Sequence, residues 1–427
     1  MAPSQKTARS AALAILMDVL GEGKLVSEVM AEGVLSKFQG PERARAQRLV
    51  QDTLRNLERL DKVLSRALRK KPPLRAMNIL RMATLELVQG GDAHGIVNEA
   101  VSLTAAHKKT AHMKGLVNAV LRKLSETVSD EWPKLRVPRL PNWLRKPLVN
   151  AYGGDVVHAI EAAHYVGAPL DITPRTASDA DRLAQALGGE VILGHSIRIT
   201  DQVQVTALPE FEKGTWWVQD AAAALPVGLL GDLTGKTALD LCAAPGGKTL
   251  QLSGQGAKVT SVDISQTRLG RVQENLERTG LVADVQQQDA LDVSGQYDVV
   301  LLDAPCSATG TIRRHPDLPH AKDGSNFGAL INLQAQMLAH AASLVSEGGL
   351  LVYCTCSLLP DEGECQVEEF LDMFPEFQPD RAFVECPSIS KEWITEEGGL
   401  RLRPDFMSSQ GGLDGFYVAY LRKTQTA

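Results

Sequence analysis

The segment DLCAAPGGKT, at residues 240–249, is the strongest indicator of the fold of this chain. It begins inside an apolar run, 237–241, that has the length of a buried strand, and it leads into a helical pattern. Gly246 and Gly247 allow the backbone to turn tightly and to approach a ligand closely. Such a turn between strand and helix is typical of a nucleotide-like ligand site in an α/β domain.

Further strand candidates follow this turn, with helical stretches between most of them. They are residues 258–262, 284–288, 297–302 and 350–353. The alternation predicts a doubly wound, Rossmann-like α/β domain with a parallel sheet. Ligands of such sheets lie beyond the carboxyl ends of the strands, and the polar motifs of this chain fall at those ends.

Carboxylates end two of the predicted strands. Asp263 is suited to accept hydrogen bonds from both hydroxyls of a ribose, and Asp289 from an adenine amino group. The glycine-rich turn matches neither the phosphate-binding pattern Gly-x-x-x-x-Gly-Lys-Ser/Thr nor the dinucleotide pattern Gly-x-Gly-x-x-Gly. We therefore expect S-adenosylmethionine, an adenosyl ligand without phosphate. The expected cofactor-binding residues are Cys242, Ala243, Ala244, Pro245, Gly246, Gly247, Lys248, Asp263, Asp289 and Asp303.

Two cysteines, Cys306 and Cys356, also follow strand-like runs. A thiolate is a strong nucleophile, and its addition to C6 of cytosine makes C5 reactive enough to accept a methyl group. Asp303 is placed to hold a proton at N3 of that base, and a second thiol or a base could assist the final elimination. Cys356, Cys306 and Asp303 are therefore the candidate catalytic residues.

The other cysteines suggest different roles. Cys354, Cys356 and Cys365 could ligate zinc, but there is no Cys-x-x-Cys pair or suitable histidine, so we expect no metal. Cys365, Cys386 and the loop residue Cys242 fit small buried side chains. Six cysteines without a framework spacing fit a reducing cytoplasm, where we expect this protein.

Length and charge divide the chain. Its 427 residues suffice for two or three domains, and no apolar run approaches the roughly 20 residues that span a bilayer, so we expect no membrane association. Residues 1–130 hold 21 Lys+Arg and 13 Asp+Glu, a net charge of +8, although the whole chain carries −6. The basic part suggests contact with a polyanion, and a solvated helical surface is the alternative.

Apolar residues at three- and four-residue spacing predict that residues 4–125 are helical throughout. Residues 131–145 contain three prolines and two tryptophans, which indicates a stiff connector. We therefore expect three parts: an all-α domain at 1–130, a connector with a small α+β subdomain at 131–213, and the Rossmann-like domain at 214–427.

These motifs resemble those of the RNA 5-methylcytosine methyltransferases of the Sun/Fmu group. The resemblance is carried by residues 240–249, 303–317, 353–357, 401–404 and 414–416. It implies that Cys356 is the nucleophile and that Cys306 aids product release. DNA cytosine methyltransferases use the Pro-Cys thiol instead, so the reverse assignment stays open.

The N-terminal part is similar to NusB-type helical RNA-binding domains, especially at residues 97–101 and 115–122. Both parts together resemble bacterial 16S ribosomal RNA cytosine-C5 methyltransferases. Two departures from the family pattern stand out: Ala308 replaces the usual glycine, and residues 173–175, Thr-Pro-Arg, replace Arg-Val-Asn.

The resemblance implies a monomeric enzyme that methylates C5 of a cytidine in small-subunit ribosomal RNA. One alternative is a non-catalytic RNA-binding or antitermination protein with a relic methyltransferase fold. Another is transfer to a base amino group, which normally uses an Asn/Asp-Pro-Pro-Tyr/Phe loop where this chain has Asp303-Ala304-Pro305-Cys306.

Overall fold

The computed structural model describes residues 7–201 and 203–424, which form two compact units. The N-terminal unit contains the described residues up to Val166 together with Ile312–Gly324. The C-terminal unit contains Gly167–Thr311 and the described residues from Ser325 onward. The chain thus leaves the C-terminal unit after Thr311 and returns to it at Ser325. The division at residues 130 and 213 remains a prediction.

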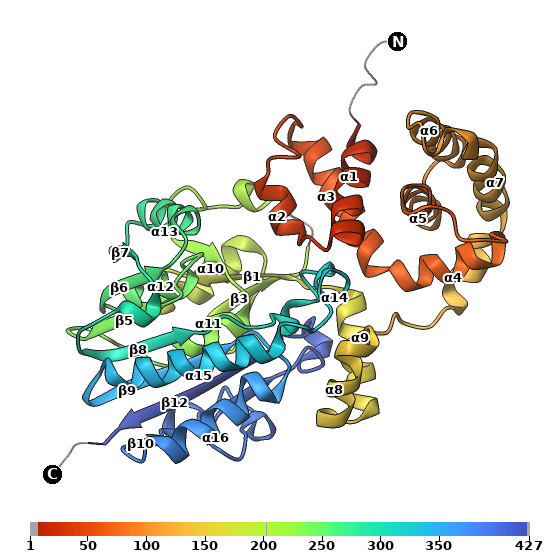
Figure 1. The fold of residues 1–427 in the computed structure, drawn as a ribbon. Helices are drawn as coiled ribbons and strands as arrows, with labels where there is room; N and C mark the ends of the chain where they lie inside the picture. The colour runs from red at the N-terminus through yellow and green to blue at the C-terminus, as the bar shows by residue number, and fades with distance from the viewer. Residues whose placement is uncertain (1–6, 202, 425–427) are drawn as a thin grey trace. The chain divides into compact units, whose positions relative to one another are not determined.

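The described residues of the N-terminal unit contain helices and no strand (Figure 1), which confirms the helices predicted up to residue 125; helices also follow in residues 131–166 and 312–324, where they were not predicted as part of this domain. Its helices are α1(Ala8–Glu22), α2(Val26–Ala31), α3(Gly40–Arg55), α4(Leu57–Ala67), α5(Leu74–Val88), α6(Ala93–Ala105), α7(Lys114–Glu131), α8(Asn142–Tyr152), α9(Gly154–Val166) and α14(Leu318–Ala321). Capping residues set the bounds of α1, because the Thr7 side chain accepts a hydrogen bond from the Ser10 amide and Gly23 ends the helix at φ +70°. The predicted helical residues 4–6 lie outside the described residues.

The core of the N-terminal unit uses the apolar faces that the sequence pattern predicts. Leu16 of α1, Leu64 of α4, Leu80 of α5 and Val117 of α7 are fully buried in one cluster. Helix α5 is buried along most of its length, which explains why its apolar residues do not form a single stripe. No helix within residues 7–201 and 203–424 has both the length and the apolarity to cross a membrane.

The C-terminal unit contains two sheets. The smaller sheet is antiparallel, has the strand order β2-β3-β1-β4, and packs against α10(Ala180–Leu187). Its strands are β1(Leu170–Pro174), β2(Glu190–Ile192), β3(Ser196–Ile199) and β4(Trp216–Val218). Asp171 and Arg198 form a buried bidentate ion pair at 2.7 Å across β1 and β3, and Trp216 fills the core beside them.

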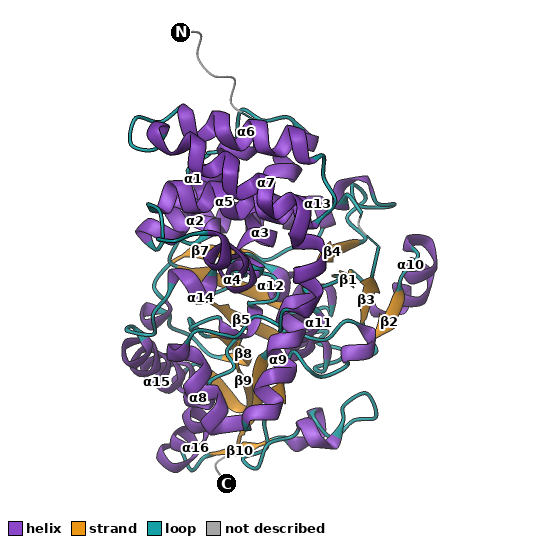
Figure 2. Ribbon diagram, turned by 90° about the vertical axis from the view of Figure 1, so that its right-hand side faces the viewer, coloured by secondary structure: helices purple, strands orange, loops and turns teal. Residues whose placement is uncertain are grey.

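The larger sheet has the strand order β10-β12-β9-β8-β5-β6-β7 (Figure 1), and β11 pairs with β12. Figure 2 shows β7, β5, β8, β9 and β10 of this sheet in orange. Its parallel strands are β5(Thr237–Leu241), β6(Lys258–Asp263), β7(Asp284–Gln287), β8(Tyr297–Asp303) and β9(Val345–Thr355), and its antiparallel strands are β10(Phe377–Pro379), β11(Leu400–Leu402) and β12(Phe416–Lys423). The strand order reverses between β5 and β8. In open α/β sheets, ligands bind at such a switch point.

Helices cover both faces of this sheet. They are α11(Ala221–Gly228), α12(Gly247–Gly254), α13(Gln266–Thr279), α15(Phe327–Ser343) and α16(Glu364–Met373). Alternation along the strands separates the two cores: Val299 and Leu301 of β8 share a cluster with α11, whereas Val300 and Leu302 share one with α15. The Rossmann-like prediction is confirmed, and all five predicted strands are present; the sequence analysis did not predict the antiparallel strands.

Candidate active site

A cavity of ≈ 430 Å³ lies at the carboxyl ends of β5, β6 and β8, beside the switch point of the large sheet. Eight of the predicted site residues line it: Cys242, Ala244, Pro245, Asp263, Asp289, Asp303, Cys306 and Cys356. Four other predicted residues belong to the glycine-rich turn but are not part of the lining: Ala243, Gly246, Gly247 and Lys248. Residues predicted separately from cofactor chemistry and from thiol chemistry thus share one cavity.

The glycine-rich turn carries the chain from β5 into α12 against one wall of this cavity. Gly246 has φ +105°, a conformation that side chains other than glycine rarely adopt, and a Cβ atom there would lie 3.2 Å from Val272. A Cβ atom on Gly247 would lie 3.1 Å from the Gln219 side chain. Gly246 therefore allows the turn to pack closely against α13, and Gly247 allows it to pack against the Gln219 side chain.

The carboxylates fit an adenosyl ligand. The Asp263 side chain is buried and accepts hydrogen bonds from the amides of Ala244 at 3.1 Å and Ser265 at 2.9 Å. Each carboxylate oxygen has a further lone pair, so Asp263 can still accept bonds from ribose hydroxyls. Asp289 is exposed at the same cavity, and a volume of ≈ 430 Å³ lies within the usual range for cofactor sites.

Asp303 connects the glycine-rich turn to the Cys354 thiol. Its Oδ2 accepts a hydrogen bond from Lys248 Nζ at 2.7 Å, and its Oδ1 accepts one from the Cys354 thiol at 3.5 Å. Burial favours a lower pKa for Lys248, but the charge of Asp303, its hydrogen bond and the neighbouring acidic groups together outweigh burial and raise that pKa, so Lys248 stays cationic. Burial, followed by the charge of Asp303, raises the pKa of Cys354, which keeps this thiol protonated.

The two predicted catalytic thiols are in direct contact, with 3.5 Å between Cys306 Sγ and Cys356 Sγ. The hydrogen bond to Cys356, burial and the charge of Cys356 together raise the pKa of Cys306 well above its ordinary value. The raised pKa keeps the Cys306 thiol protonated, and either sulfur could be the donor in this contact. Burial, helped by three nearby aspartates, raises the pKa of Cys242 to about 12, so this third thiol is a poor nucleophile.

Several lining residues were missed by the sequence analysis. Arg268 of α13 donates to the Ala244 carbonyl at 2.5 Å and lies 3.6 Å from Asp263. Leu333 and Met337 of α15 supply apolar lining, and their spacing of four residues is the same as that of an ordinary core face. Among the described residues, no cluster of His, Cys, Asp and Glu could hold a metal ion.

The backbone conformation explains why the family pattern has glycine where this chain has Ala308. Ala308 has φ +58°, in the left-handed region that favours glycine, and it lines the cavity two residues after Cys306. This explains why glycine suits that position. At the other departure, Arg175 donates to the Thr279 carbonyl at 2.9 Å, so its guanidinium serves a contact within the C-terminal unit.

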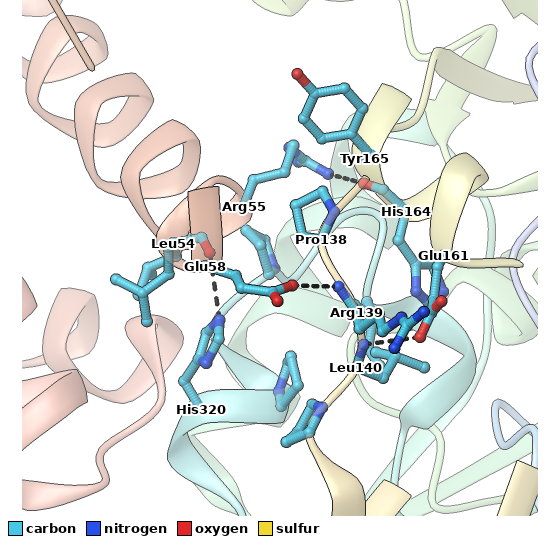
Figure 3. A pocket seen from close by; sticks show the side chains of 15 residues that line it. Leu54, Arg55, Glu58, Pro138, Arg139, Leu140, Glu161, His164, Tyr165 and His320 are labelled. Atoms are coloured by element: carbon cyan, nitrogen blue, oxygen red, sulfur yellow. Dashed lines mark hydrogen bonds between the residues drawn. The ribbon is translucent and has the colours of Figure 1, made fainter. Parts of the chain in front are cut away.

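A second, smaller cavity of ≈ 60 Å³ lies within the N-terminal unit (Figure 3). Arg55 donates to the carbonyl of His164 at 2.6 Å there, and His320 contacts the carbonyl of Leu54 at 3.2 Å (Figure 3). Neither ring nitrogen of His164 has a hydrogen-bond partner, and burial, followed by the charges of Arg313 and Arg55, lowers its pKa to about 3. The lining contains no thiol and none of the predicted site residues.

The reversed strand order, the glycine-rich turn and the carboxylates at one cavity define a Rossmann-type methyltransferase domain. Residues 228–422 match the family described as "16S rRNA methyltransferase RsmB/F", and residues 6–126 match the NusB family. The chain is 34% identical to "Ribosomal RNA small subunit methyltransferase B" of Salmonella arizonae, over 98% of this chain and 99% of the relative. It is 32% identical to the protein of that name from Pasteurella multocida, over 97% and 96% of the two chains.

This chain therefore belongs to the family of ribosomal RNA small subunit methyltransferases B, which confirms the resemblance noted in its motifs. Solved structures support the fold. PH0851 has a TM-score of 0.74 and 23% identity, with 98% of this chain and 99% of that chain covered. NSun6 from Pyrococcus horikoshii, solved with SFG, has a TM-score of 0.57 and 19% identity, with 67% and 99% covered.

Proposed function

We propose that this protein methylates C5 of a cytidine in small-subunit ribosomal RNA, with S-adenosylmethionine as methyl donor and Cys356 as nucleophile. The observation that carries the proposal is that two thiols in contact line the same cavity as the carboxylates Asp263 and Asp289. A methyl transfer to a base amino group would not need either thiol.

In this proposal Asp263 and Asp289 bind the adenosine, and the turn at residues 242–248 holds the methionine end. S-adenosylmethionine, when bound, supplies an electrophilic methyl group. Lys248 keeps Asp303 in place through their ion pair, and the apolar side chains of Leu333 and Met337 limit water in the cavity.

Cys356 and Cys306 have different roles in the remaining steps, the addition to the base and its release. The Cys356 thiolate adds to C6 of the cytosine, and the electron pair of the C5–C6 double bond moves so that C5 becomes nucleophilic. Asp303 holds a proton at N3 during this addition. After C5 has gained the methyl group, its proton passes to a solvent base and that C–H electron pair re-forms the C5–C6 double bond. The C6–S bond breaks with its electron pair on the Cys356 sulfur, and Cys306 assists by donating a hydrogen bond to that sulfur. The target base must be unstacked to reach the cavity.

The N-terminal unit supplies affinity for RNA through phosphate contacts. Five basic residues on or near α7 are exposed: Lys108, Lys109, Lys114, Arg122 and Lys123. Each neutralised phosphate contributes about −0.7 to the slope of log affinity against log salt for single strands. Replacing Lys108, Lys109 and Lys114 with glutamine should flatten that slope by about 2, whereas an unchanged slope would contradict this role.

The test uses ribosomal RNA from cells that lack this protein, the purified enzyme and methyl-labelled S-adenosylmethionine. Digestion to nucleosides should place the label in 5-methylcytidine, and Cys356→Ala should abolish it. Cys365→Ala is the matched control, because Cys365 lies outside the cavity lining, and it should remain active. Label in another nucleoside would overturn the proposal.

A second comparison separates the roles of the two thiols. Cys306→Ala should still form the C6 adduct but release it slowly, so a covalent protein–RNA complex should accumulate. Cys356→Ala should form none. An adduct in Cys356→Ala and none in Cys306→Ala would reverse the assignment and make Cys306 the nucleophile.

A further inference from the structure

A buried carboxylate links the two loops that carry the thiols. Glu362 lies in the turn between β9 and α16, and its side chain is fully buried. Its Oε1 accepts hydrogen bonds from the Ser307 amide at 2.9 Å and from Gln334 Nε2 at 3.0 Å. Its Oε2 accepts bonds from the hydroxyls of Ser307 and Ser357, each at 2.5 Å.

The two serines are the residues that directly follow the two thiols. Ser307 follows Cys306 and Ser357 follows Cys356, although the two pairs lie in loops after different strands, β8 and β9. Backbone contacts add to this link, because the Gly310 amide donates to the Cys356 carbonyl at 3.0 Å. One carboxylate therefore fixes the separation of both loops.

The groups around the Glu362 side chain suit a carboxylate. A carboxylate has two oxygens with about four lone-pair sites, which match one amide N–H, one Nε2–H and two hydroxyls. Glutamine would place an NH2 group at the position of Oε2, so the Ser307 and Ser357 hydroxyls would have to accept there in place of donating. A buried group with one partner lost costs about 1–3 kcal/mol, so the loops would move to relieve the mismatch.

We propose that Glu362 is a positioning residue that holds Cys306 and Cys356 in contact by binding both following serines. This inference rests on the proposed function, since it concerns the same two thiols. Without Glu362 the two loops separate. Cys356 then reaches C6 of the base without Cys306 close enough to assist.

The test compares Glu362→Gln with Glu368→Gln, an exposed glutamate on the adjoining helix α16. For Glu362→Gln, kcat should fall about 100-fold, the loss that follows a misplacement of about 1 Å, while KM for RNA stays close to wild type. Glu368→Gln should leave both values unchanged. Loss of stability alone would instead lower the concentration of folded enzyme and leave kcat per folded enzyme unchanged.

A chemical readout measures the thiol contact without RNA. Diamide converts the two S–H groups into one S–S bond and itself takes up two electrons and two protons, becoming a hydrazine. Mass spectrometry then follows the Cys306–Cys356 disulfide with time. Wild type and Glu368→Gln should form it fast, and Glu362→Gln should form it more slowly. If Glu362→Gln does not fold, Ser307→Ala and Ser357→Ala each remove one donor and should each slow the reaction.

The outcomes distinguish the two proposals. Unchanged kcat and unchanged disulfide formation in Glu362→Gln would overturn the positioning role, whatever the enzyme methylates. If Glu362→Gln forms the disulfide more slowly than wild type, but the wild-type enzyme makes no 5-methylcytidine, the positioning role is supported and the proposed function is refuted. A fall in kcat together with slower disulfide formation supports both.

Discussion

Replacing Asp303 with asparagine should both destabilise the C-terminal unit and abolish methyl transfer, and a second substitution separates these effects. Asp303 is the ion-pair partner of Lys248, at 2.7 Å, and Lys248 is 8% exposed. Asparagine retains the shape of the side chain and one carbonyl oxygen. It removes the negative charge that keeps Lys248 cationic inside the protein.

The size of the effect follows from burial. Removing one partner of a fully buried ion pair costs about 3–5 kcal/mol, because the other charge stays uncompensated. The Asp303 side chain is 32% exposed, so solvent screens part of the loss and we expect about 2–3 kcal/mol. Replacing Lys248 with methionine in the same protein removes the uncompensated charge, so most of this loss should be recovered.

Urea unfolding of wild type, Asp303→Asn and the double variant Asp303→Asn with Lys248→Met measures the first effect. Single-turnover methylation measures the second, and both variants should be inactive because neither can hold a proton at N3. A destabilisation below about 0.5 kcal/mol in Asp303→Asn would refute the argument from burial. Activity regained in the double variant would show that Asp303 acts only through Lys248.

Three further predictions concern other positions. His164 has a folded pKa of about 3, below its usual 6.5, so its contribution to stability is complete above pH 6.5 and is lost as pH falls toward 3. At pH 5 the loss is about 2 kcal/mol, and urea unfolding of His164→Gln should show a correspondingly weaker pH dependence than wild type. Gly310→Ala places a Cβ atom 1.9 Å from the carbonyl oxygen of Gly415, so the loop that carries Cys306 must shift, which disturbs the bond from the Gly310 amide to the Cys356 carbonyl; methylation rates should fall about 100-fold. Ala308→Gly relieves a left-handed backbone at φ +58° and should change the free energy of unfolding by less than about 1 kcal/mol while preserving activity; a loss of activity would show that the methyl group itself is needed.

The sequence was sufficient to predict the parallel strands of the large sheet because their signals are local. Each predicted strand is a short apolar run next to a turn, and Thr237–Leu241 coincides with β5. The ends of these strands then gather the predicted site residues automatically, since the carboxyl ends of parallel strands meet at one edge. This is why Asp263 and Cys306, though far apart in sequence, could be assigned to one region.

The remaining features depend on contacts between distant residues. Glu362 stands in an acidic stretch that looks solvated, and only its bonds to Ser307 and Ser357 reveal its burial. Strand β12 comes last in the sheet by sequence but pairs with β9, and no local pattern encodes that choice. The motif at 414–416 was recognised, but its contact with Gly310, through the Gly415 amide at 2.8 Å, was not predictable.

The excursion at residues 312–324 limits how this enzyme can be recombined. The backbone passes between the two units three times, so Asp317 meets the Val26 amide at 2.8 Å and His320 meets the Leu54 carbonyl inside the N-terminal unit. A chimera that joins residues 1–166 of one relative to the remainder of another would build its helical unit from two parents. Gene exchange at the first boundary is therefore constrained by residues encoded almost 150 codons downstream. The helical unit cannot be exchanged as one continuous segment of the gene.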